Sequence, residues 1–395
     1  ARHAMAGKGT ALVTGGAGFI GSYITDELLR RGYAVRILDN LEPQVHGALR
    51  ENAARPDYLS PEAELILGDV RDPEAVRNAL HGADFLIHQA ALVGVPQSMY
   101  DIRRYTDINA MGGATVLDVA MNDRTIRDRL QKMVVASSMS IYGEGAYRCP
   151  DHGAVFPKLR PLPQLQAHGW PMQCPMPACD HVVTAIPTDE SKPLQPLSIY
   201  AIGKRDHEEM FLAVGRAYGI PTVALRYWQV YGQRQALSNP YTGVGAIFCS
   251  RVLAGNAPPV YEDGAQLRDF VHAKDIARAN ALALESASAT DHAINIGTGS
   301  PISIADVAWT VVREMGADRD GIAPEILQQF RPGDTRDCFP DISAARDLLG
   351  YAPTIPFAEG AKELVAWVRD QKGRAEDRFD QAQRELQAKG LGSAS

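Results

Sequence analysis

The sequence has no apolar run that approaches the roughly 18–20 residues a membrane-spanning helix needs, so no membrane partner is expected. It has no long basic stripe either, and its net charge of −7 argues against nucleic acid as a partner. Cysteine is scarce, because five in 395 residues is an odd and low number that does not suggest a disulfide framework. The first nine residues lack an apolar stretch, so we expect no signal peptide and a reducing, cytoplasmic environment.

Apolar residues are numerous enough to build a sizeable core. The chain is 45% hydrophobic and 22% charged, which excludes a mostly disordered protein. At about 150 residues per domain, the length corresponds to two or three domains.

Strand-like and helix-like segments alternate along the N-terminal half of the chain. Short apolar segments predict strands at 10–14, 34–38, 65–67, 85–88, 132–137 and 222–225, with a return strand at 293–296. Helical spacing predicts helices at 19–31, 73–80, 102–122 and 200–218, the first of which ends at Gly32. This alternation is typical of an α/β fold with a doubly wound parallel sheet.

A glycine-rich turn follows the first predicted strand. Gly15, Gly18 and Gly21 have G-x-x-G-x-x-G spacing and open the first helix, a context in which the backbone can approach a pyrophosphate. Asp39 ends the second strand, where a carboxylate binds ribose hydroxyls and favours NAD over NADP. The alternative is a structural glycine turn beside a solvated aspartate.

A tyrosine and a lysine share one face of a predicted helix. Tyr200 and Lys204 are four residues apart, and Ser138 follows a strand on the side where a cofactor would bind. A phenol has a pKa near 10, so Tyr200 can act as a base near pH 7 only if positive charges lower its pKa. The alternative is a chance Tyr-x-x-x-Lys pattern on a surface helix.

Eight segments in order along the chain carry a family resemblance. They are Thr14–Gly21, His88–Ala91, Asn109–Gly112, Ser137–Gly143, Tyr200–Lys204, Leu225–Tyr227, Arg268–Phe270 and Arg331–Asp334. In these segments the chain resembles the extended short-chain dehydrogenases/reductases, in their nucleotide-sugar epimerase branch. The resemblance implies a Rossmann sheet with a smaller C-terminal α/β substrate lobe, NAD, a nucleotide-diphosphate sugar, and a homodimer formed by helices 102–122 and 200–218.

The resemblance also implies the domain organisation. We expect an NAD-binding Rossmann domain over 1–230, a substrate-binding lobe over 231–375 of which 270–297 return to the first domain, and a tail over 376–395. Residues 146–196 are rich in proline and cysteine and show no clear period, which predicts an insertion or a long functional loop within the first domain.

Site residues are implied by the matching positions. The cofactor residues would be Gly15, Gly18, Phe19, Ile20, Asp39, Asn40, Asp69, Val70, Ala90, Tyr200 and Lys204. The substrate residues would be Ser138, Gln229, Arg268, Arg331 and Asp334. For the last three residues, a salt bridge between the lobes is the alternative. Two departures from the family pattern are Gln229, where asparagine is usual, and Gly203, where a residue with a side chain is usual.

The resemblance implies a mechanism as well. Tyr200 would take the proton from a sugar hydroxyl, usually at C4, while hydride passes to NAD. Lys204 would hold the nicotinamide ribose and lower the pKa of Tyr200, and Ser138 would bind the same oxygen. The related 4,6-dehydratases carry an Asp-Glu pair just after the catalytic serine or threonine. Met139 and Ser140 occupy those positions here, which argues against a dehydratase.

Three segments narrow the prediction to a subgroup. Residues 39–47, 97–100 and 237–243 are similar to bacterial dTDP-L-rhamnose 4-epimerases, so a 4-epimerase of a dTDP-L-rhamnose-like sugar is predicted. Three alternatives remain open: an oxidoreductase or 4-ketoreductase with net redox, an epimerase of UDP-glucose or UDP-glucuronate or at another carbon, and a cofactor-bound scaffold without turnover.

The insertion holds a candidate zinc site. Cys149 and His152 are followed by Cys174 and Cys179, which together offer four ligands to a tetrahedral ion. His168 or His181 could replace one of them, and a loop of free thiols is the alternative. If zinc binds, the site should be structural, because the tyrosine chemistry needs no metal.

Overall fold

A computed structural model describes residues 7–52, 54–239, 241, 243–371 and 377–392. Residues 240 and 242 of the segment 237–243, and residues 376 and 393–395 of the expected tail, lie outside the described residues. Within the described chain, no helix is both long and apolar enough to cross a membrane.

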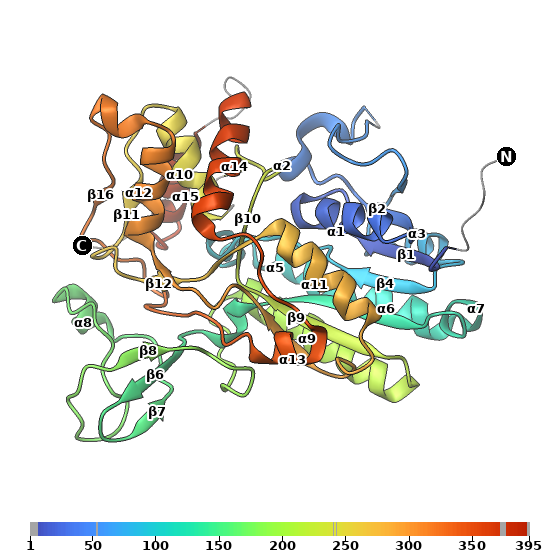
Figure 1. Cartoon of the computed structure of the whole chain (residues 1–395), viewed down its shortest axis with the longest axis horizontal. Helices are drawn as coiled ribbons and strands as arrows, with labels where there is room; N and C mark the ends of the chain where they lie inside the picture. The colour runs from blue at the N-terminus through green and yellow to red at the C-terminus, as the bar shows by residue number, and fades with distance from the viewer. Residues whose placement is uncertain (1–6, 53, 240, 242, 372–376, 393–395) are drawn as a thin grey trace.

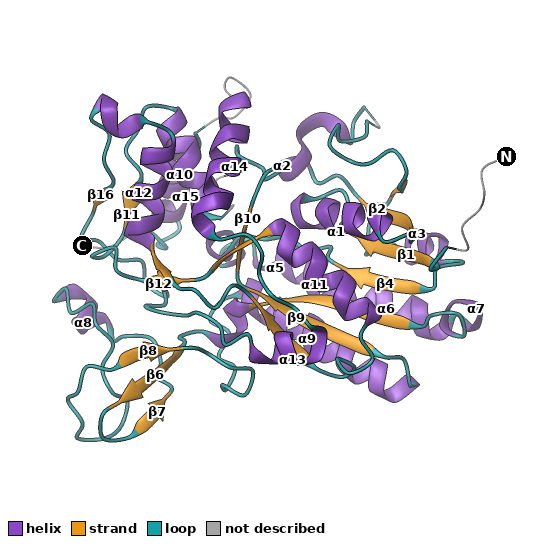
Figure 2. Cartoon of the chain, viewed as in Figure 1, coloured by secondary structure: helices purple, strands orange, loops and turns teal. Residues whose placement is uncertain are grey.

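Seven parallel strands form the central sheet (Figures 1 and 2). Their order is β14-β9-β5-β4-β1-β2-β3, and every neighbouring pair is parallel. The strands are β1 (Thr10–Thr14), β2 (Ala34–Asp39), β3 (Glu64–Leu67), β4 (Phe85–His88), β5 (Lys132–Ser138), β9 (Thr222–Tyr227) and β14 (Ala293–Ile296). The predicted doubly wound parallel sheet is confirmed, and each predicted strand is present with its ends within two residues.

Helices cover both faces of the sheet. On one face α1 (Phe19–Arg30) packs on α11 (Ala273–Glu285), with α13 (Ser343–Leu349) beside β14. On the other face lie α3 (Pro73–Leu80), α6 (Gly112–Asn122) and α9 (Ile199–Tyr218). Alternating side chains of the strands supply the two cores, as in β5, where Val134 joins the first core and Met133 and Val135 join the second.

The predicted helix over 102–122 is one helical path with a wider turn inside it. It consists of α5 (Ile102–Thr106), a π-helical segment (Asp107–Met111) and α6. Such wide turns are common at functional sites, and the sequence pattern did not predict this one.

A second lobe follows β9 and stands at the upper left of Figure 1. Its helices are α10 (Val244–Leu253), α12 (Ile304–Glu314), α14 (Phe357–Asp370) and α15 (Phe379–Ala388). Short strands pair as β10 (Gln229–Tyr231) with β13 (Phe270–His272), β11 (Pro259–Val260) with β16 (Glu325–Ile326), and β12 (Leu267–Arg268) with β15 (Ile302–Ser303). The lobe has a core of its own, which includes Phe248, Phe270 and Val312.

The proline-rich insertion forms a small subdomain at the lower left of Figure 1. Its three antiparallel strands are ordered β7 (Gly153–Val155), β6 (Ala146–Cys149) and β8 (Thr184–Ile186), and a short helix α8 (Leu162–Gln166) lies beside them. The strands have only three or four residues each, which explains why no periodicity marks them in the sequence. The remaining short helices are α2 (Pro43–His46), α4 (Val95–Ser98) and α7 (Arg124–Arg127).

A buried ion pair joins α9 to the sheet. Arg226 on β9 donates to both carboxylate oxygens of Glu208 at 2.9 and 2.6 Å, and the two side chains are only 6% and 4% exposed. Arg226 also donates to the Tyr142 hydroxyl at 2.6 Å, and this hydroxyl donates to Asn295 on β14 at 2.8 Å. The network therefore connects α9, β9 and β14 through groups that would be costly to leave unpaired.

Arg226→Met should lower the free energy of unfolding by about 3–5 kcal/mol, because Glu208 would be left buried without its partner. The double variant Arg226→Met/Glu208→Leu should lose less free energy of unfolding, because no unpaired charge stays buried. Arg205→Met is the matched control, since Arg205 and Glu209 form an exposed pair on the same helix at 2.7 Å, worth about 0.5 kcal/mol or less. Urea unfolding followed by circular dichroism measures all three, and an equal loss in Arg226→Met and Arg205→Met would contradict this assignment.

Candidate active site

One large cavity lies at the carboxyl end of the parallel strands and extends under the second lobe. Its volume is about 700 Å³. All residues predicted to bind cofactor or substrate line it: Gly15, Gly18, Phe19, Ile20, Asp39, Asn40, Asp69, Val70, Ala90, Ser138, Tyr200, Lys204, Gln229, Arg268, Arg331 and Asp334.

The glycine turn between β1 and α1 forms one wall of the cavity. Gly15 has φ +69°, and a Cβ there would lie 2.8 Å from the backbone of Ala90. A Cβ on Gly21 would lie 2.2 Å from the carbonyl oxygen of Gly15. Only glycine fits these two positions, so the turn stays close to β4 and leaves the first turn of α1 next to the cavity. That first turn holds no acidic residue, so the positive end of the helix dipole is available to a pyrophosphate.

Polar side chains lie at the carboxyl ends of β2 and β3. The Asp39 carboxylate accepts from the backbone N–H of Ala17 at 3.0 Å and of Leu41 at 2.8 Å. Burial raises the pKa of Asp39. Asn40 donates to Asp69 at 3.1 Å, and the hydrogen bond from Arg71 lowers the pKa of Asp69 to about 2. Asp69 therefore stays ionised at neutral pH, in the part of the cavity where the sequence predicts the adenosine of the cofactor.

Tyr200, Lys204 and Ser138 meet deeper in the same cavity. Ser198 caps α9 by accepting from the Ala201 N–H at 3.1 Å, which fixes the first turn that carries Tyr200. Ser138 ends β5 and forms a hydrogen bond with the Tyr200 hydroxyl. Lys204 is 4% exposed and donates to the carbonyl oxygen of Ala136 at 3.3 Å. Helix α9 packs along β5, so this helix and this strand together position the three side chains.

Burial acts on both titratable groups of this cluster. It raises the pKa of Tyr200 to about 12, partly offset by the hydrogen bond with Ser138. It lowers the pKa of Lys204 to about 8. The sequence predicts that the charges of Lys204 and of an oxidised nicotinamide lower the pKa of Tyr200. Burial acts in the opposite direction, because removing the phenolate from water costs more than the serine hydrogen bond returns.

The π-helical segment packs directly against this part of α9. Asn109 accepts from the Leu92 N–H at 2.8 Å and donates to the Leu92 carbonyl at 3.1 Å, which fixes a loop of the cavity wall. Its own carbonyl oxygen lies 2.8 Å from Nε2 of His207. A Cβ on Gly203 would lie 3.3 Å from Cβ of Asn109. Glycine at position 203 thus permits the close approach of the two helices, which accounts for that departure from the family pattern.

The segment after β5 carries no carboxylate at its first two positions. Met139 and Ser140 line the cavity, and Ser140 donates to the Ser138 hydroxyl at 2.9 Å. Gln229 reaches the same region, where its Nε2 lies 3.7 Å from the Met139 sulfur. Its Oε1 is buried and has no hydrogen-bond partner within the described chain. A ligand with a donor group would satisfy that oxygen.

The two arginines that the sequence predicts to bind substrate make different contacts. Arg268 donates to the carbonyl oxygens of Leu267, Thr335 and Arg336 and to the Thr335 hydroxyl, at 2.7 to 3.0 Å. It therefore holds the 335–336 segment in place. Arg331 donates through Nε to Asp334 at 2.8 Å and lies over the Tyr261 ring at 4.5 Å. This ion pair is local to residues 331–334, in contrast to the predicted alternative of a bridge between the lobes.

Some residues of the cavity wall were missed by the sequence analysis. Phe379, Ala382, Gln383 and Leu386 of α15 line it, and Ala382 and Leu386 are buried. The apolar spacing along 379–386 is the only feature of the sequence that could have predicted this contact, and the helix is otherwise polar.

The insertion brings Cys149, His152, Cys174 and Cys179 together, away from the cavity lining. His168 instead stacks on Trp170, and His181 pairs with Asp151 at 2.9 Å.

Comparison with known proteins agrees with this architecture. The model of the NAD dependent epimerase/dehydratase family matches residues 11–161 and 174–297. The chain is 33% identical over 367 residues to dTDP-L-rhamnose 4-epimerase of Burkholderia thailandensis, with 92% of this chain and 96% of that protein covered.

Two solved structures have the same fold. One is UDP-glucose 4-epimerase of Thermotoga maritima with UDP-glucose, at 27% identity and a TM-score of 0.71, covering 92% of this chain and 99% of that one. The other is UDP-glucose 4-epimerase of Thermus thermophilus with NAD, at 30% identity and a TM-score of 0.68, covering 91% and 99%. The chain belongs to the NAD-dependent epimerase/dehydratase family, within the extended short-chain dehydrogenases/reductases, and is a nucleotide-sugar enzyme of that family.

Proposed function

We propose that this enzyme is an NAD-dependent nucleotide-sugar 4-epimerase that acts on dTDP-L-rhamnose or a related nucleotide-diphosphate hexose. The observation that carries the proposal is the meeting of Ser138, Tyr200 and Lys204 in the cavity that also holds the glycine turn. Met139 and Ser140 next to this cluster cannot supply the acid and base that a dehydration requires. These features support epimerisation over elimination.

The cofactor end of the cavity fits NAD. Gly15 and Gly21 leave room for a pyrophosphate at the first turn of α1. Asp39 lies at the end of β2, where a carboxylate can bind the ribose hydroxyls of NAD. When bound, NAD supplies the acceptor for the hydride that leaves the sugar and the donor that returns it.

We assign the proton transfers to Tyr200. Its phenolate takes the proton of the sugar 4-hydroxyl, while Ser138 forms a hydrogen bond with the same oxygen. Lys204 holds the nicotinamide ribose, and its positive charge stabilises the phenolate. The keto sugar then turns in the cavity, and Tyr200 returns the proton to the oxygen of the epimer. Burial, partly offset by the hydrogen bond with Ser138, raises the pKa of Tyr200 to about 12, so the proposed base depends on neighbouring positive charge.

We assign the nucleotide-sugar contacts to the far side of the cavity. Arg331 is suited to the diphosphate, because a guanidinium presents several donors to phosphate oxygens. Arg268 stabilises the segment that carries Asp334 and Thr335, and Asp334 is assigned to the nucleoside ribose. Gln229, with its unpaired buried Oε1, is assigned to the sugar or the diphosphate. The similarity to a dTDP-L-rhamnose 4-epimerase supports the choice of sugar.

A homodimer is part of the proposal. Helices α5, α6 and α9 and the π-helical segment pack together and leave apolar side chains exposed, with Ile102 at 50%, Met111 at 57% and Ile202 at 44%. Pairing of these helices between two copies would bury those side chains. Light scattering should then detect twice the chain mass of 42.8 kDa.

The purified enzyme, without added cofactor, should convert dTDP-L-rhamnose to its 4-epimer with no net formation of NADH. UDP-glucose and UDP-glucuronate should be converted more slowly, and NMR of each reaction identifies product and carbon. Net consumption of cofactor would instead establish an oxidoreductase. If the enzyme converted only a UDP-sugar, that sugar would take the place of dTDP-L-rhamnose as the proposed substrate. If the enzyme held NAD but converted none of the three sugars, another sugar or another carbon would be favoured.

Tyr200→Phe should lower kcat by about 10²–10⁴-fold on the same substrate, because the variant loses its general base. Its content of bound NAD should match the wild type, since the phenyl ring keeps the wall of the cavity. Tyr218→Phe is the matched control, because Tyr218 lies on the same helix and is 49% exposed. Steady-state kinetics measure both variants. Equal kcat for Tyr200→Phe and Tyr218→Phe would remove Tyr200 from the mechanism.

Lys204→Met should move the acidic limb of the kcat/KM profile to higher pH. Removal of a positive charge raises the pKa of the Tyr200 phenol, and each unit of increase lowers the phenolate fraction at a given pH by about tenfold. Lys274→Met is the control, because Lys274 pairs with Glu363 at the surface. An acidic limb that stays at the wild-type pH would show that Lys204 does not stabilise the phenolate.

A further inference from the structure

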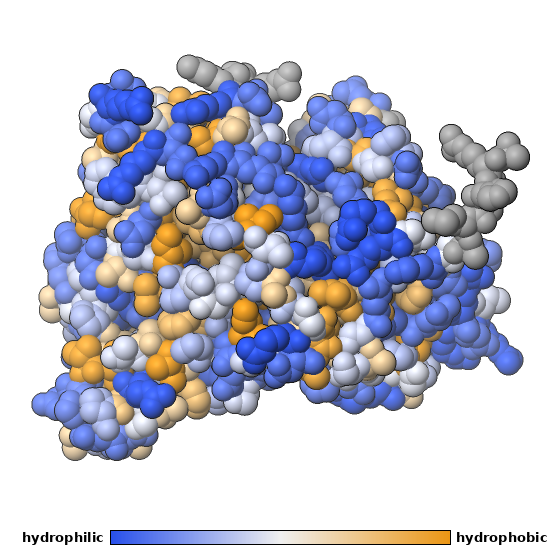
Figure 3. All heavy atoms as spheres, in the orientation of Figure 1, coloured by the Kyte–Doolittle hydropathy of each residue, from blue (hydrophilic) through white to orange (hydrophobic). Residues whose placement is uncertain are grey.

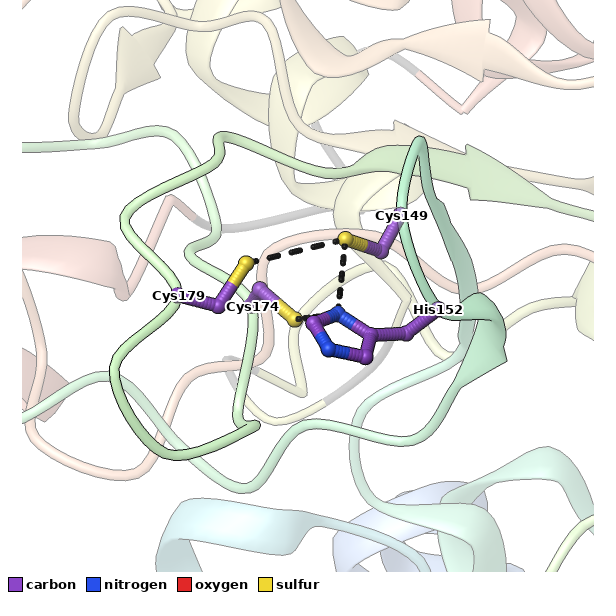
Figure 4. A group of neighbouring side chains, drawn as sticks. All are labelled: Cys149, His152, Cys174 and Cys179. Atoms are coloured by element: carbon purple, nitrogen blue, oxygen red, sulfur yellow. Dashed lines mark hydrogen bonds between the residues drawn. The ribbon is translucent and has the colours of Figure 1, made fainter.

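Four metal-ligating side chains meet in the insertion. Cys149 ends β6 and His152 lies in the turn that follows it, whereas Cys174 and Cys179 come from the loop before β8. Their three sulfurs and Nδ1 of the histidine all lie within 4.8 Å of one another. Figure 4 shows these atoms pointing toward a common centre from two separate segments of chain.

The separations match the edges of a zinc tetrahedron. With Zn–S of about 2.3 Å and Zn–N of about 2.0 Å, the edges are roughly 3.8 Å between sulfurs and 3.5 Å between sulfur and nitrogen. Here Cys149 Sγ lies 3.8 Å from Cys179 Sγ and 3.4 Å from Nδ1 of His152. Cys174 Sγ lies 3.7 Å from the same nitrogen. A disulfide would need two sulfurs about 2.05 Å apart.

The insertion has little apolar core with which to fold. Beside the cysteines, its buried cluster contains Tyr147, Val155, Met172 and Val183. Phe156, Leu162, Met176 and Val182 are 42–59% exposed, and hydrophobic side chains are visible over this region at the lower left of Figure 3. Small units with so little core commonly depend on a metal for their structure.

We propose that Cys149, His152, Cys174 and Cys179 bind one zinc ion in a closed structural site, and that this site supports the substrate side of the cavity. Four protein ligands complete the tetrahedron and leave no position for substrate. Binding converts the three thiols to thiolates and releases their protons to solvent. None of the four residues lines the cavity, so the ion acts through structure.

The ordered insertion is connected to the second lobe by buried charges. Arg160 forms a two-pronged ion pair with Glu262 at 2.8 Å, and the two side chains are 1% and 2% exposed. Glu262 also accepts from Arg336 at 2.9 Å. Removal of Arg160 from this position would leave part of the Glu262 charge uncompensated in a dry environment.

Apolar and polar contacts continue this connection toward the site. Trp170 packs with Leu165 and Phe330, and its Nε1 donates to Gln328 at 3.2 Å. In β6, the Tyr147 hydroxyl accepts a hydrogen bond from the Asp337 N–H at 3.0 Å. The insertion therefore contacts both ends of residues 328–337.

This segment carries the substrate residues of the proposed function, on which this second part of the inference rests. Arg331 and Asp334 lie within it, and Arg268 donates to its Thr335. An insertion without its metal would lose the fixed position of Arg160 and Trp170 and loosen the segment. The metal should thus affect substrate binding and leave NAD binding unchanged.

Metal analysis of the tag-free enzyme, purified under reducing conditions without chelator, should find one zinc per chain. His152→Ala and Cys174→Ser should lose it. His181→Ala, His168→Ala and Cys249→Ser should keep it, because His181 pairs with Asp151, His168 stacks on Trp170, and Cys249 is buried in α10. X-ray absorption on the native enzyme should find three sulfur neighbours and one nitrogen, a readout that does not depend on the folding of any variant.

Three results would overturn the zinc site. One is a wild-type protein that takes up no zinc when supplied with it. Another is full zinc content in both His152→Ala and Cys174→Ser. The third is a titration under denaturing conditions that finds three thiols rather than the five of the sequence, which would indicate a disulfide.

The supporting role has its own test, separate from the activity proposal because zinc content is measured without substrate. Chelator-treated enzyme and Arg160→Met should each show a several-fold rise in KM for the nucleotide sugar, with unchanged NAD content. Arg160→Met should keep its zinc. An unchanged KM in both would overturn the supporting role, whatever the metal content.

Discussion

Parallel strands of one sheet all end at the same edge, and the active site of this enzyme depends on that constraint. The glycine turn follows β1, Asp39 ends β2, Ala90 follows β4 and Ser138 ends β5. These residues are separated by up to 123 positions in the chain, yet all line one cavity. The second lobe then adds another part of the cavity wall, through residues that include Arg331, Asp334 and Thr335.

Burial in the cavity shifts the pKa values of Tyr200 and Lys204 in opposite directions. The same enclosure that excludes water raises the pKa of Tyr200 to about 12 and lowers the pKa of Lys204 to about 8. In the proposed mechanism, a tyrosine with such a raised pKa needs added positive charge to act as a base near neutral pH. This requirement follows from the depth at which the tyrosine is buried.

Buried charges outside the site hold its walls in place. Arg226 and Glu208 connect α9, which carries Tyr200 and Lys204, to the sheet. Arg160 and Arg336 meet at Glu262 and connect the insertion to the second lobe. Charge pairs of this kind require near-ideal geometry and full hydrogen bonding to be tolerated. They therefore fix relative positions more strictly than apolar contacts do.

Local patterns of spacing and residue type were enough to predict the parallel sheet, the glycine turn, the Tyr200–Lys204 pair and the four candidate zinc ligands. The contacts between side chains follow from the folded chain: Arg331 pairs with Asp334, Gly203 packs on the π-helical turn, and α15 lines the cavity. The strands of the insertion were missed because three or four residues show no period. Pairings between distant segments depend on how the chain packs, which periodicity does not encode.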